Sequence, residues 1–242
     1  MKLRFFLLVI LVFACVLMAH PTDQVFVPPK PDEPKRFCED VQRWLSYAEK
    51  SKDLVEITNM EGLRMDLRYG TFNNVTGHDL YCGEQRAFVR KEAYTMLKKT
   101  IAYMQKEMPG SVLVIFDGAR PVYAQAALKK MVQGTPYSHY VSSPGKGGLH
   151  NFGLALDLSI TDADGNLLDM GTDFDSFERC AGAVGEKDAL KSGRLTQEQV
   201  DNRNKLRRIM RKAGWVSLSS EWWHFNAYTR EYTYENFTKF PI

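Results

Sequence analysis

The amino-acid sequence predicts an α+β fold, a single domain in which helices flank a mostly antiparallel sheet. Stretches with the spacing of amphipathic helices alternate with short strand-like stretches, without the strict rhythm of a parallel βαβ sheet. The chain has 242 residues, of which 44% are hydrophobic and 25% are charged, and this balance excludes a disordered protein. About 200 residues remain once the N-terminal segments are set aside, enough for one hydrophobic core.

The first residues have the pattern of an export signal, and residues 1–19 are predicted to be a signal peptide. A short basic start precedes an apolar stretch from Phe5 to Ala19, which is the length of a signal-peptide core and short for a membrane span. Two processing sites are open. Cleavage occurs either after Ala19 or, if the chain is a lipoprotein, before Cys15, which then carries the lipid.

A linker is predicted to follow at residues 20–36, which leaves residues 37–242 as the folded domain. Five of the ten prolines lie in this linker, where their fixed backbone angle favours a semi-rigid tether. The whole chain has 32 basic and 29 acidic residues, which excludes the strong basic excess of a nucleic-acid-binding protein. The folded domain has no long apolar run, so we expect membrane attachment only through a lipid on Cys15.

The first half of the folded domain contains five predicted elements. Apolar residues at helical spacing favour helices over 38–50 and 88–108. Alternation of apolar and charged residues over 63–68 indicates a half-buried strand. The apolar run 111–116 leads into an Asp-Gly turn, which is typical of a buried strand. A proline at the first turn favours a helix over 121–133.

The second half is predicted to begin with a long loop over 134–149, which is rich in Gly, Ser and Pro. Thr196 and Gln199 match a capping box, which opens a helix that ends before Gly214. Three strands are predicted in this half, over 152–160, 215–218 and 222–228.

Common catalytic motifs such as the nucleophile elbow and the phosphate-binding loop are absent, and what remains is a set of metal-binding residue types. His150 is followed by Asp157, and His224 lies far downstream. A catalytic zinc takes three protein ligands and keeps one position open, which these residues satisfy. Glu221 is then free to accept a proton from water near the metal. By spacing alone, a purely structural role for His150 is an equally open interpretation.

Longer stretches around these residues carry a family pattern. His-x-x-Gly-x-Ala-x-Asp at 150–157 and Glu-Trp-Trp-His at 221–224 are its two main motifs. Further segments follow in the same order, at 66–69, 117–121, 170–175 and 202–210. Together they resemble the zinc D-alanyl-D-alanine dipeptidases of the VanX type over most of the folded domain. The resemblance implies a zinc site in a cleft on the sheet.

The resemblance also implies a role for each matching residue. Three residues would bind one Zn²⁺ per chain: His150, Asp157 and His224. Glu221 would be the general base, which later passes its proton to the leaving amine. Arg120 would stabilise the oxyanion, because a guanidinium stays charged at any working pH; without the family it reads as a surface arginine after a turn. Asp175 would bind the ammonium group of a free dipeptide, and Tyr69 would line the same end.

The chain departs from the family pattern in ways that bear on the cleft. Gly148 stands where the family usually has a serine, so we expect that hydroxyl contact to be missing or supplied by the backbone. Ala119 replaces a tyrosine, and the segment between Arg120 and His150 is shorter than in the antibiotic-resistance enzymes. We therefore expect a more open cleft, which would admit longer peptides.

The function that the resemblance implies is hydrolysis of D-Ala-D-Ala to free D-alanine, in cell-wall peptide turnover outside the cytoplasm. One alternative is a zinc D,D-carboxypeptidase or endopeptidase that acts on peptidoglycan stem peptides. Another is a zinc-stabilised binding module without turnover. Asp175 favours the dipeptide, and the presence of both Glu221 and Arg120 argues against a binding module.

The folded domain has three cysteines, at positions 38, 82 and 180. An exported protein can form disulfides, so one bond and one free thiol are expected. The sequence leaves the pairing open.

Overall fold

The structure is a computed structural model that describes residues 31–242. The predicted signal peptide, both of its processing sites and the linker up to residue 30 lie outside the described residues. In the described part of the chain, no helix has the length and apolar character needed to cross a membrane.

A five-stranded sheet with the order β2-β4-β5-β7-β6 forms the centre of the fold. Its strands are β2 (Leu63–Met65), β4 (Leu113–Asp117), β5 (Ala155–Ile160), β6 (Val216–Ser217) and β7 (His224–Asn226). β2 runs parallel to β4, and the other neighbours are antiparallel. A second, two-stranded sheet joins β1 (Leu54–Glu56) to β3 (Phe88–Arg90). The α+β class with a mostly antiparallel sheet is therefore confirmed.

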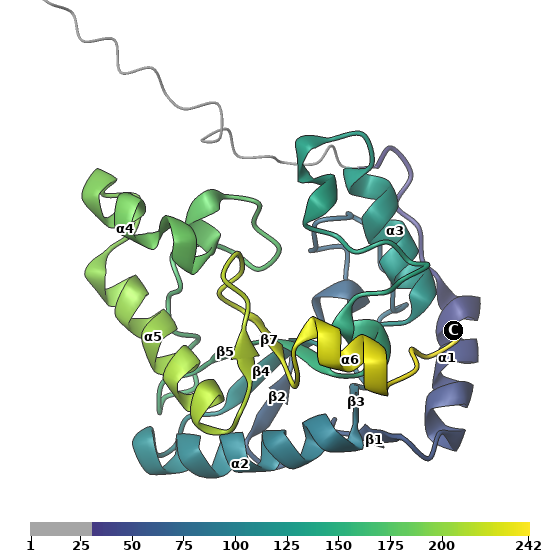
Figure 1. Cartoon of the computed structure of the whole chain (residues 1–242), viewed down its shortest axis with the longest axis horizontal. Coiled ribbons are helices and arrows are strands. Elements are labelled where there is room, and N and C mark those ends of the chain that lie inside the picture. Colours follow the sequence, from purple (N-terminus) through teal and green to yellow (C-terminus); the bar gives the residue numbers. More distant parts are fainter. Residues whose placement is uncertain (1–30) are drawn as a thin grey trace, which may run out of the picture.

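Six α-helices accompany these strands in the described residues. They are α1 (Cys38–Lys50), α2 (Lys91–Glu107), α3 (Val122–Val132), α4 (Ala183–Ser192), α5 (Gln197–Lys212) and α6 (Arg230–Asn236). Figure 1 shows α4 and α5 on one side of β5 and β7, and α3, α6 and α1 on the other. We call these the α4–α5 side and the α3–α6 side. The central strands lie between them.

The two central strands, β4 and β5, are buried along their whole length. Their sequences are therefore continuous apolar runs, since both faces of the sheet are covered. Each fully buried aliphatic side chain contributes about 1.5–3 kcal/mol to folding. The charged residues in this apolar layer are Asp117 at the end of β4 and Asp157 in β5, both nearly inaccessible to solvent. Two carboxylates in such a place need hydrogen-bond or ion-pair partners inside the fold.

Several predicted boundaries are wrong because pairing between distant segments overrides local periodicity. The helix predicted over 88–108 loses its first turn to strand β3, which pairs with β1. The strand predicted over 152–160 starts three residues later than expected. Before it, Leu149–Phe152 forms a 3₁₀ turn that ends at Gly153, whose φ of 66° suits glycine. The other predicted strands are present but shorter, and β1, α4 and α6 had no counterpart among the expectations.

Two helix predictions are confirmed at the level of single residues. α1 covers the predicted range 38–50. α5 opens with the predicted capping box, in which the Thr196 hydroxyl accepts from the Gln199 amide at 3.2 Å. In return, the Gln199 side chain accepts from the Thr196 amide at 2.9 Å. These contacts satisfy two amides that the helix itself leaves unpaired.

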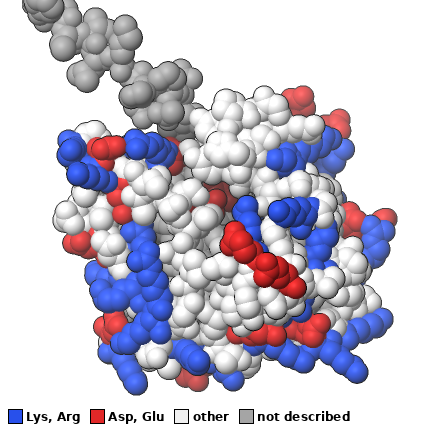
Figure 2. Space-filling view, viewed as in Figure 1, with Lys and Arg blue, Asp and Glu red and all other residues white. Residues whose placement is uncertain are grey.

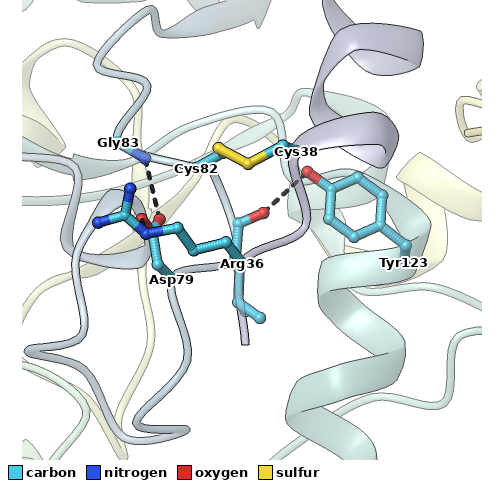
Figure 3. The surroundings of a disulfide bond; sticks show 7 residues. Arg36, Cys38, Asp79, Cys82, Gly83 and Tyr123 are labelled. Atoms are coloured by element: carbon cyan, nitrogen blue, oxygen red, sulfur yellow. Dashed lines mark hydrogen bonds and ion pairs between the residues drawn. A yellow bond between two sulfur atoms is a disulfide. The ribbon is translucent and has the colours of Figure 1, made fainter. Parts of the chain in front are cut away.

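A disulfide between Cys38 and Cys82 joins the first turn of α1 to a distant loop (Figure 3). Beside it, the Asp79 carboxylate accepts from the Gly83 amide at 3.0 Å, which shapes the loop around Cys82. Cys180 is a free, buried thiol. The structure thus settles the pairing that the sequence left open.

Loss of this disulfide should destabilise the protein. Cys38→Ser is expected to lower the free energy of unfolding by about 3–4 kcal/mol, because the bond closes a long loop in the unfolded chain. Urea denaturation with and without reductant measures the effect. Reductant should destabilise the wild type and the Cys180→Ala control equally, and leave Cys38→Ser unchanged. An unchanged wild type would show that the bond contributes no stability.

Candidate active site

Three elements bring the predicted metal ligands together. His150 lies in the 3₁₀ turn Leu149–Phe152, Asp157 in β5 and His224 at the start of β7. Asp157 and His224 are direct cross-strand partners. The carboxylate of Asp157 lies 3.2 Å from Nε2 of His150 and 2.9 Å from Nδ1 of His224. The three ligand atoms lie within 4.8 Å of one another, close enough to share one ion.

Hydrogen bonds on the outer side of each imidazole fix which nitrogen faces the centre of the cluster. Nδ1 of His150 lies 2.8 Å from the carbonyl oxygen of Gly118. Nε2 of His224 lies 2.8 Å from the side-chain oxygen of Asn226. Both oxygens can only accept, so both outer nitrogens donate, and in the neutral rings the inner nitrogens hold lone pairs. Such outer contacts commonly orient histidine ligands of metals.

On the inner side of the cluster, acceptor atoms of the two histidines and of Asp157 therefore face one another. Nε2 of His150 and Nδ1 of His224 are 3.1 Å apart, and the carboxylate of Asp157 adjoins both. Burial by itself works to raise the pKa of Asp157, whereas the two histidines lower it when they are protonated and donate to the carboxylate. Two imidazole nitrogens and one carboxylate oxygen suit Zn²⁺, and three protein ligands leave a position for water or substrate. The residues present thus fit a catalytic metal.

Arg120 is part of this cluster and not a surface residue. Only 8% of it is exposed. Its guanidinium donates to Asp117 at 2.7 Å and to Gln125 at 3.1 Å, and its third nitrogen lies 3.3 Å from Asp157. Although burial disfavours its charge, the neighbouring carboxylates raise the pKa of Arg120 above its usual value. The alternative of an ordinary surface arginine is therefore wrong.

Asp117 is a member of the cluster that the sequence analysis did not single out. It accepts from the Tyr81 hydroxyl at 2.7 Å as well as from Arg120, and it lies 3.5 Å from Nδ1 of His150. One carboxylate thus contacts both the arginine and the first histidine. The signal that could have found it is an acidic residue at the end of an apolar strand, which must have a partner inside the fold.

Glu221 borders the same centre. Its carboxylate oxygen lies 3.9 Å from Nδ1 of His224. Trp222 and Trp223, the two residues between them, are both buried, so the aromatic pair anchors the segment in the core. Burial raises the pKa of Glu221 to about 7, and the charges of Asp157 and Asp175 act in the same direction. A carboxyl group with such a pKa can both accept and return a proton near neutral pH.

Comparison with known proteins agrees with this geometry. The profile of the peptidase M15 family, described as D-ala-D-ala dipeptidase, matches residues 50–241. The chain belongs to this metallopeptidase family. It is 37% identical to a D-alanyl-D-alanine dipeptidase of Escherichia coli (strain K12) over 163 residues, which cover 67% of this chain and 78% of that protein.

A second relative in this family comes from Enterococcus faecium. That D-alanyl-D-alanine dipeptidase is 29% identical over 203 residues, covering 76% of this chain and 94% of that protein. The family profile, over residues 50–241, includes all the segments that hold the cluster.

The two remaining predicted residues of this metallopeptidase meet at one end of the site. The buried Tyr69 hydroxyl donates to the Asp175 carboxylate, at 2.8 Å from one oxygen and 3.1 Å from the other. Asp175 has a φ of 61°, a conformation that non-glycine residues rarely adopt. Burial raises the pKa of Asp175 to about 7. Asp175 is thus a half-buried carboxylate with one side-chain donor, and it has capacity for a cationic group.

The segment that carries Asp175 is held by a buried arginine of α5. Arg203 is completely inaccessible to solvent. It donates to the carbonyl oxygens of Met170 at 2.7 Å and Cys180 at 2.6 Å, at the two ends of the segment, and pairs with Glu186 at 3.2 Å. This clamp from α5 keeps Asp175 at a fixed place opposite the metal ligands.

Most of the predicted site residues line one cavity of about 110 Å³. Six of the seven predicted site residues line it: Tyr69, Arg120, Asp157, Asp175, Glu221 and His224. His150 is buried beneath it, in contact with Asp157 and His224. Figure 2 shows acidic atoms in a hollow near the middle of this face of the molecule.

Gly148 also lines the cavity, and a neighbouring serine lies beside it. A Cβ at Gly148 would lie 3.6 Å from the hydroxyl oxygen of Ser142, which lines the cavity as well. The expectation that this hydroxyl contact is missing or supplied by the backbone did not consider Ser142, whose hydroxyl lies beside Gly148 at the cavity. Its separation of six residues along the chain, across a loop, gave no sequence signal for this proximity.

Zn²⁺ should bind at this site in a ratio of one ion per chain and stabilise the fold. At a free concentration of 100 Kd, binding adds about 2.7 kcal/mol to the free energy of unfolding. Metal analysis after dialysis and thermal unfolding measure the two effects.

His224→Ala should remove both. His139→Ala, which changes an exposed histidine outside the cluster, should keep them. Retention of zinc by His224→Ala would refute the assigned ligand set.

Glu221 should make the metal-free protein less stable as the pH rises. Its pKa of about 7 in the folded protein lies above the usual value of 4.5, so the folded state holds its proton longer than the unfolded state does. The stability from this proton is complete below pH 4 and is lost between about pH 4.5 and 7. Glu221→Gln should therefore stabilise the metal-free protein by about 2–3 kcal/mol more at pH 8 than at pH 4.5. Urea denaturation at both values measures the difference, and equal values would contradict the assignment.

Proposed function

We propose that this metallopeptidase hydrolyses the dipeptide D-Ala-D-Ala to two molecules of D-alanine, with one Zn²⁺ bound by His150, Asp157 and His224. The observation that carries the proposal is the convergence of three ligands, a carboxyl group and a guanidinium on one cavity. A binding module would need the ligands but not Glu221 and Arg120. The names of both relatives support the choice of substrate.

Each group has a chemical task in this reaction. When bound, Zn²⁺ supplies a Lewis acid that polarises the scissile carbonyl and makes water more acidic. Glu221 accepts the proton of the attacking water and then delivers it to the nitrogen of the leaving D-alanine. Arg120 offers a permanent positive charge to the carbonyl oxygen, where negative charge develops. Asp117 and Gln125 hold the guanidinium in place at 2.7 and 3.1 Å.

The amino end of the substrate is assigned to Asp175. Its half-buried carboxylate lines the cavity and is oriented by the Tyr69 hydroxyl. A free ammonium group would neutralise it, whereas an acylated nitrogen, as in a longer peptide, would leave it unpaired at a substantial cost. This contact favours dipeptides over stem peptides.

A second candidate function is D,D-carboxypeptidase or endopeptidase activity on peptidoglycan stem peptides. It is favoured by a neighbouring cavity of about 470 Å³ on the same segment, which shares Val75, Asp175, Ser176 and Phe177 with the first. A peptide that extends past Asp175 could occupy this space. Cleavage of an N-acylated peptide separates the two candidates.

We place the enzyme outside the cytoplasm, in the periplasm or cell envelope, with a role in cell-wall peptide turnover. The export signal predicted for residues 1–19 supports this location. The Cys38–Cys82 disulfide supports it as well, because such bonds persist in oxidising compartments. An enzyme outside the cytoplasm meets D-Ala-D-Ala released from the wall and not the cytoplasmic precursor pool.

Release of D-alanine from D-Ala-D-Ala by the zinc-loaded protein tests the function. Glu221→Gln should lower kcat by about 10²- to 10⁴-fold while zinc still binds, since the base is lost and the ligands are kept. N-acetyl-D-Ala-D-Ala should be a poor substrate if Asp175 binds an ammonium group. Rapid cleavage of the acetylated peptide would favour the carboxypeptidase, and no cleavage of either by the zinc-loaded protein would refute both.

A further inference from the structure

The lining of the active-site cavity contains two arginines, which differ in their contacts. Arg120 is buried, and Asp117, Gln125 and Asp157 already engage its guanidinium. Arg230, the first residue of α6, is exposed at the cavity. Among the described residues it has no hydrogen bond or ion pair for its side chain. Arg230 therefore has all five of its donors available to a ligand.

The position of Arg230 is fixed although its side chain is unpaired. The Thr229 hydroxyl caps α6 by accepting from the Tyr232 amide. Farther along the helix, the Tyr234 hydroxyl donates to the Gly147 carbonyl at 2.9 Å, and its ring packs against Phe152. Gly147 precedes the turn that carries His150, and Phe152 is the last residue of that turn. α6 thus holds Arg230 at a defined place relative to the metal ligands.

Arg230 and Asp175 reach the cavity from opposite walls. Asp175 belongs to the segment that Arg203 of α5 clamps, on the α4–α5 side. Arg230 begins α6, on the α3–α6 side (Figure 1). β5 and β7, with the ligands Asp157 and His224, lie between these sides (Figure 1). The cavity therefore has an acidic group at one wall, a basic group at the other and the reaction centre between.

From this arrangement we infer that Arg230 binds the terminal carboxylate of the substrate and so makes the enzyme selective for peptides with a free C-terminus one residue after the scissile bond. The inference rests on the proposed function and deepens it. A dipeptide is a zwitterion, and its two residues span at most about 7 Å between the charged ends. With its ammonium group at Asp175, its carboxylate points across the metal ligands toward the other wall.

The guanidinium of Arg230 and the terminal carboxylate of a peptide are chemically complementary. A guanidinium presents a planar fork that pairs with both oxygens of a carboxylate. An amide or an extended chain at the same place offers one neutral oxygen and no charge. A contact of this kind therefore disfavours endopeptidase activity, in which the chain continues beyond the leaving residue.

The test compares D-Ala-D-Ala with its C-terminal amide, D-Ala-D-Ala-NH₂, for the wild type and three variants loaded with zinc. Arg230→Ala should raise KM for the free acid by about 10- to 100-fold, as expected for loss of a charge-assisted contact, with little change in kcat. Its KM for the amide should change less than twofold. Arg230→Lys should recover part of the loss, because it keeps the charge.

Lys146→Ala is the matched control for the overall charge. Lys146 is an exposed cation on the same side, packed over the Tyr234 ring at 4.6 Å, and it does not line the cavity. Its removal should leave the preference for the acid over the amide intact. An equal loss in both variants would mean that general electrostatic attraction, and not a contact of Arg230, sets the preference, and would overturn the inference.

Other outcomes are equally decisive. If Arg230→Ala lowers turnover of the acid and the amide to the same extent, Arg230 does not bind the substrate carboxylate. The same conclusion follows if the variant lowers turnover of neither peptide. If the wild type cleaves the acid and the amide equally well, the peptidase activity stands and only this inference fails. If the zinc-loaded wild type cleaves neither, the proposed function fails and the inference fails with it.

Discussion

The register of three neighbouring strands is the constraint on which the site depends. Antiparallel pairing places Asp117 of β4 opposite Asp157 of β5, and Asp157 opposite His224 of β7. One row across the sheet thus supplies two metal ligands and the carboxylate that holds Arg120. A shift of one residue would turn these side chains to the other face. An irregularity in β4 between Ile115 and Asp117 sets the direction of the last side chain in this strand.

This register concentrates charge inside the fold, and the surrounding residues balance it. Asp157 adjoins Arg120 and both histidines, while Asp117 is satisfied by Arg120 and the Tyr81 hydroxyl. Removal of one member of such a buried pair costs about 3–5 kcal/mol, since the remaining charge is left uncompensated. The cluster is thus a structural unit as well as a catalytic one. Stability and metal binding cannot be varied independently at these positions.

The sequence predicted the metal ligands and Glu221 as a set because their motifs are contiguous and their residue types are chemically specific. It missed Asn226 and the Gly118 carbonyl, although alternation along a strand places Asn226 on the same face as His224. The first turn of the 88–108 helix and the cysteine pairing depend on contacts between distant segments, so local periodicity could not reveal them. Ser142 beside Gly148 belongs to the same class of contact.

The two ends of the cavity differ in burial, and this sets how strictly each end selects. Asp175 is half-buried, bonded to Tyr69 and carried by a segment that Arg203 clamps, so a substrate without an ammonium group would leave a partly desolvated charge unpaired. Arg230 is exposed, and water can replace a missing carboxylate there at little cost. A site built to pair with a buried polar group rejects analogues far more strongly than an exposed one. Selection for a free ammonium group at the amino end should therefore be stricter than selection for a free carboxylate at the other end, although both act on the same short peptide.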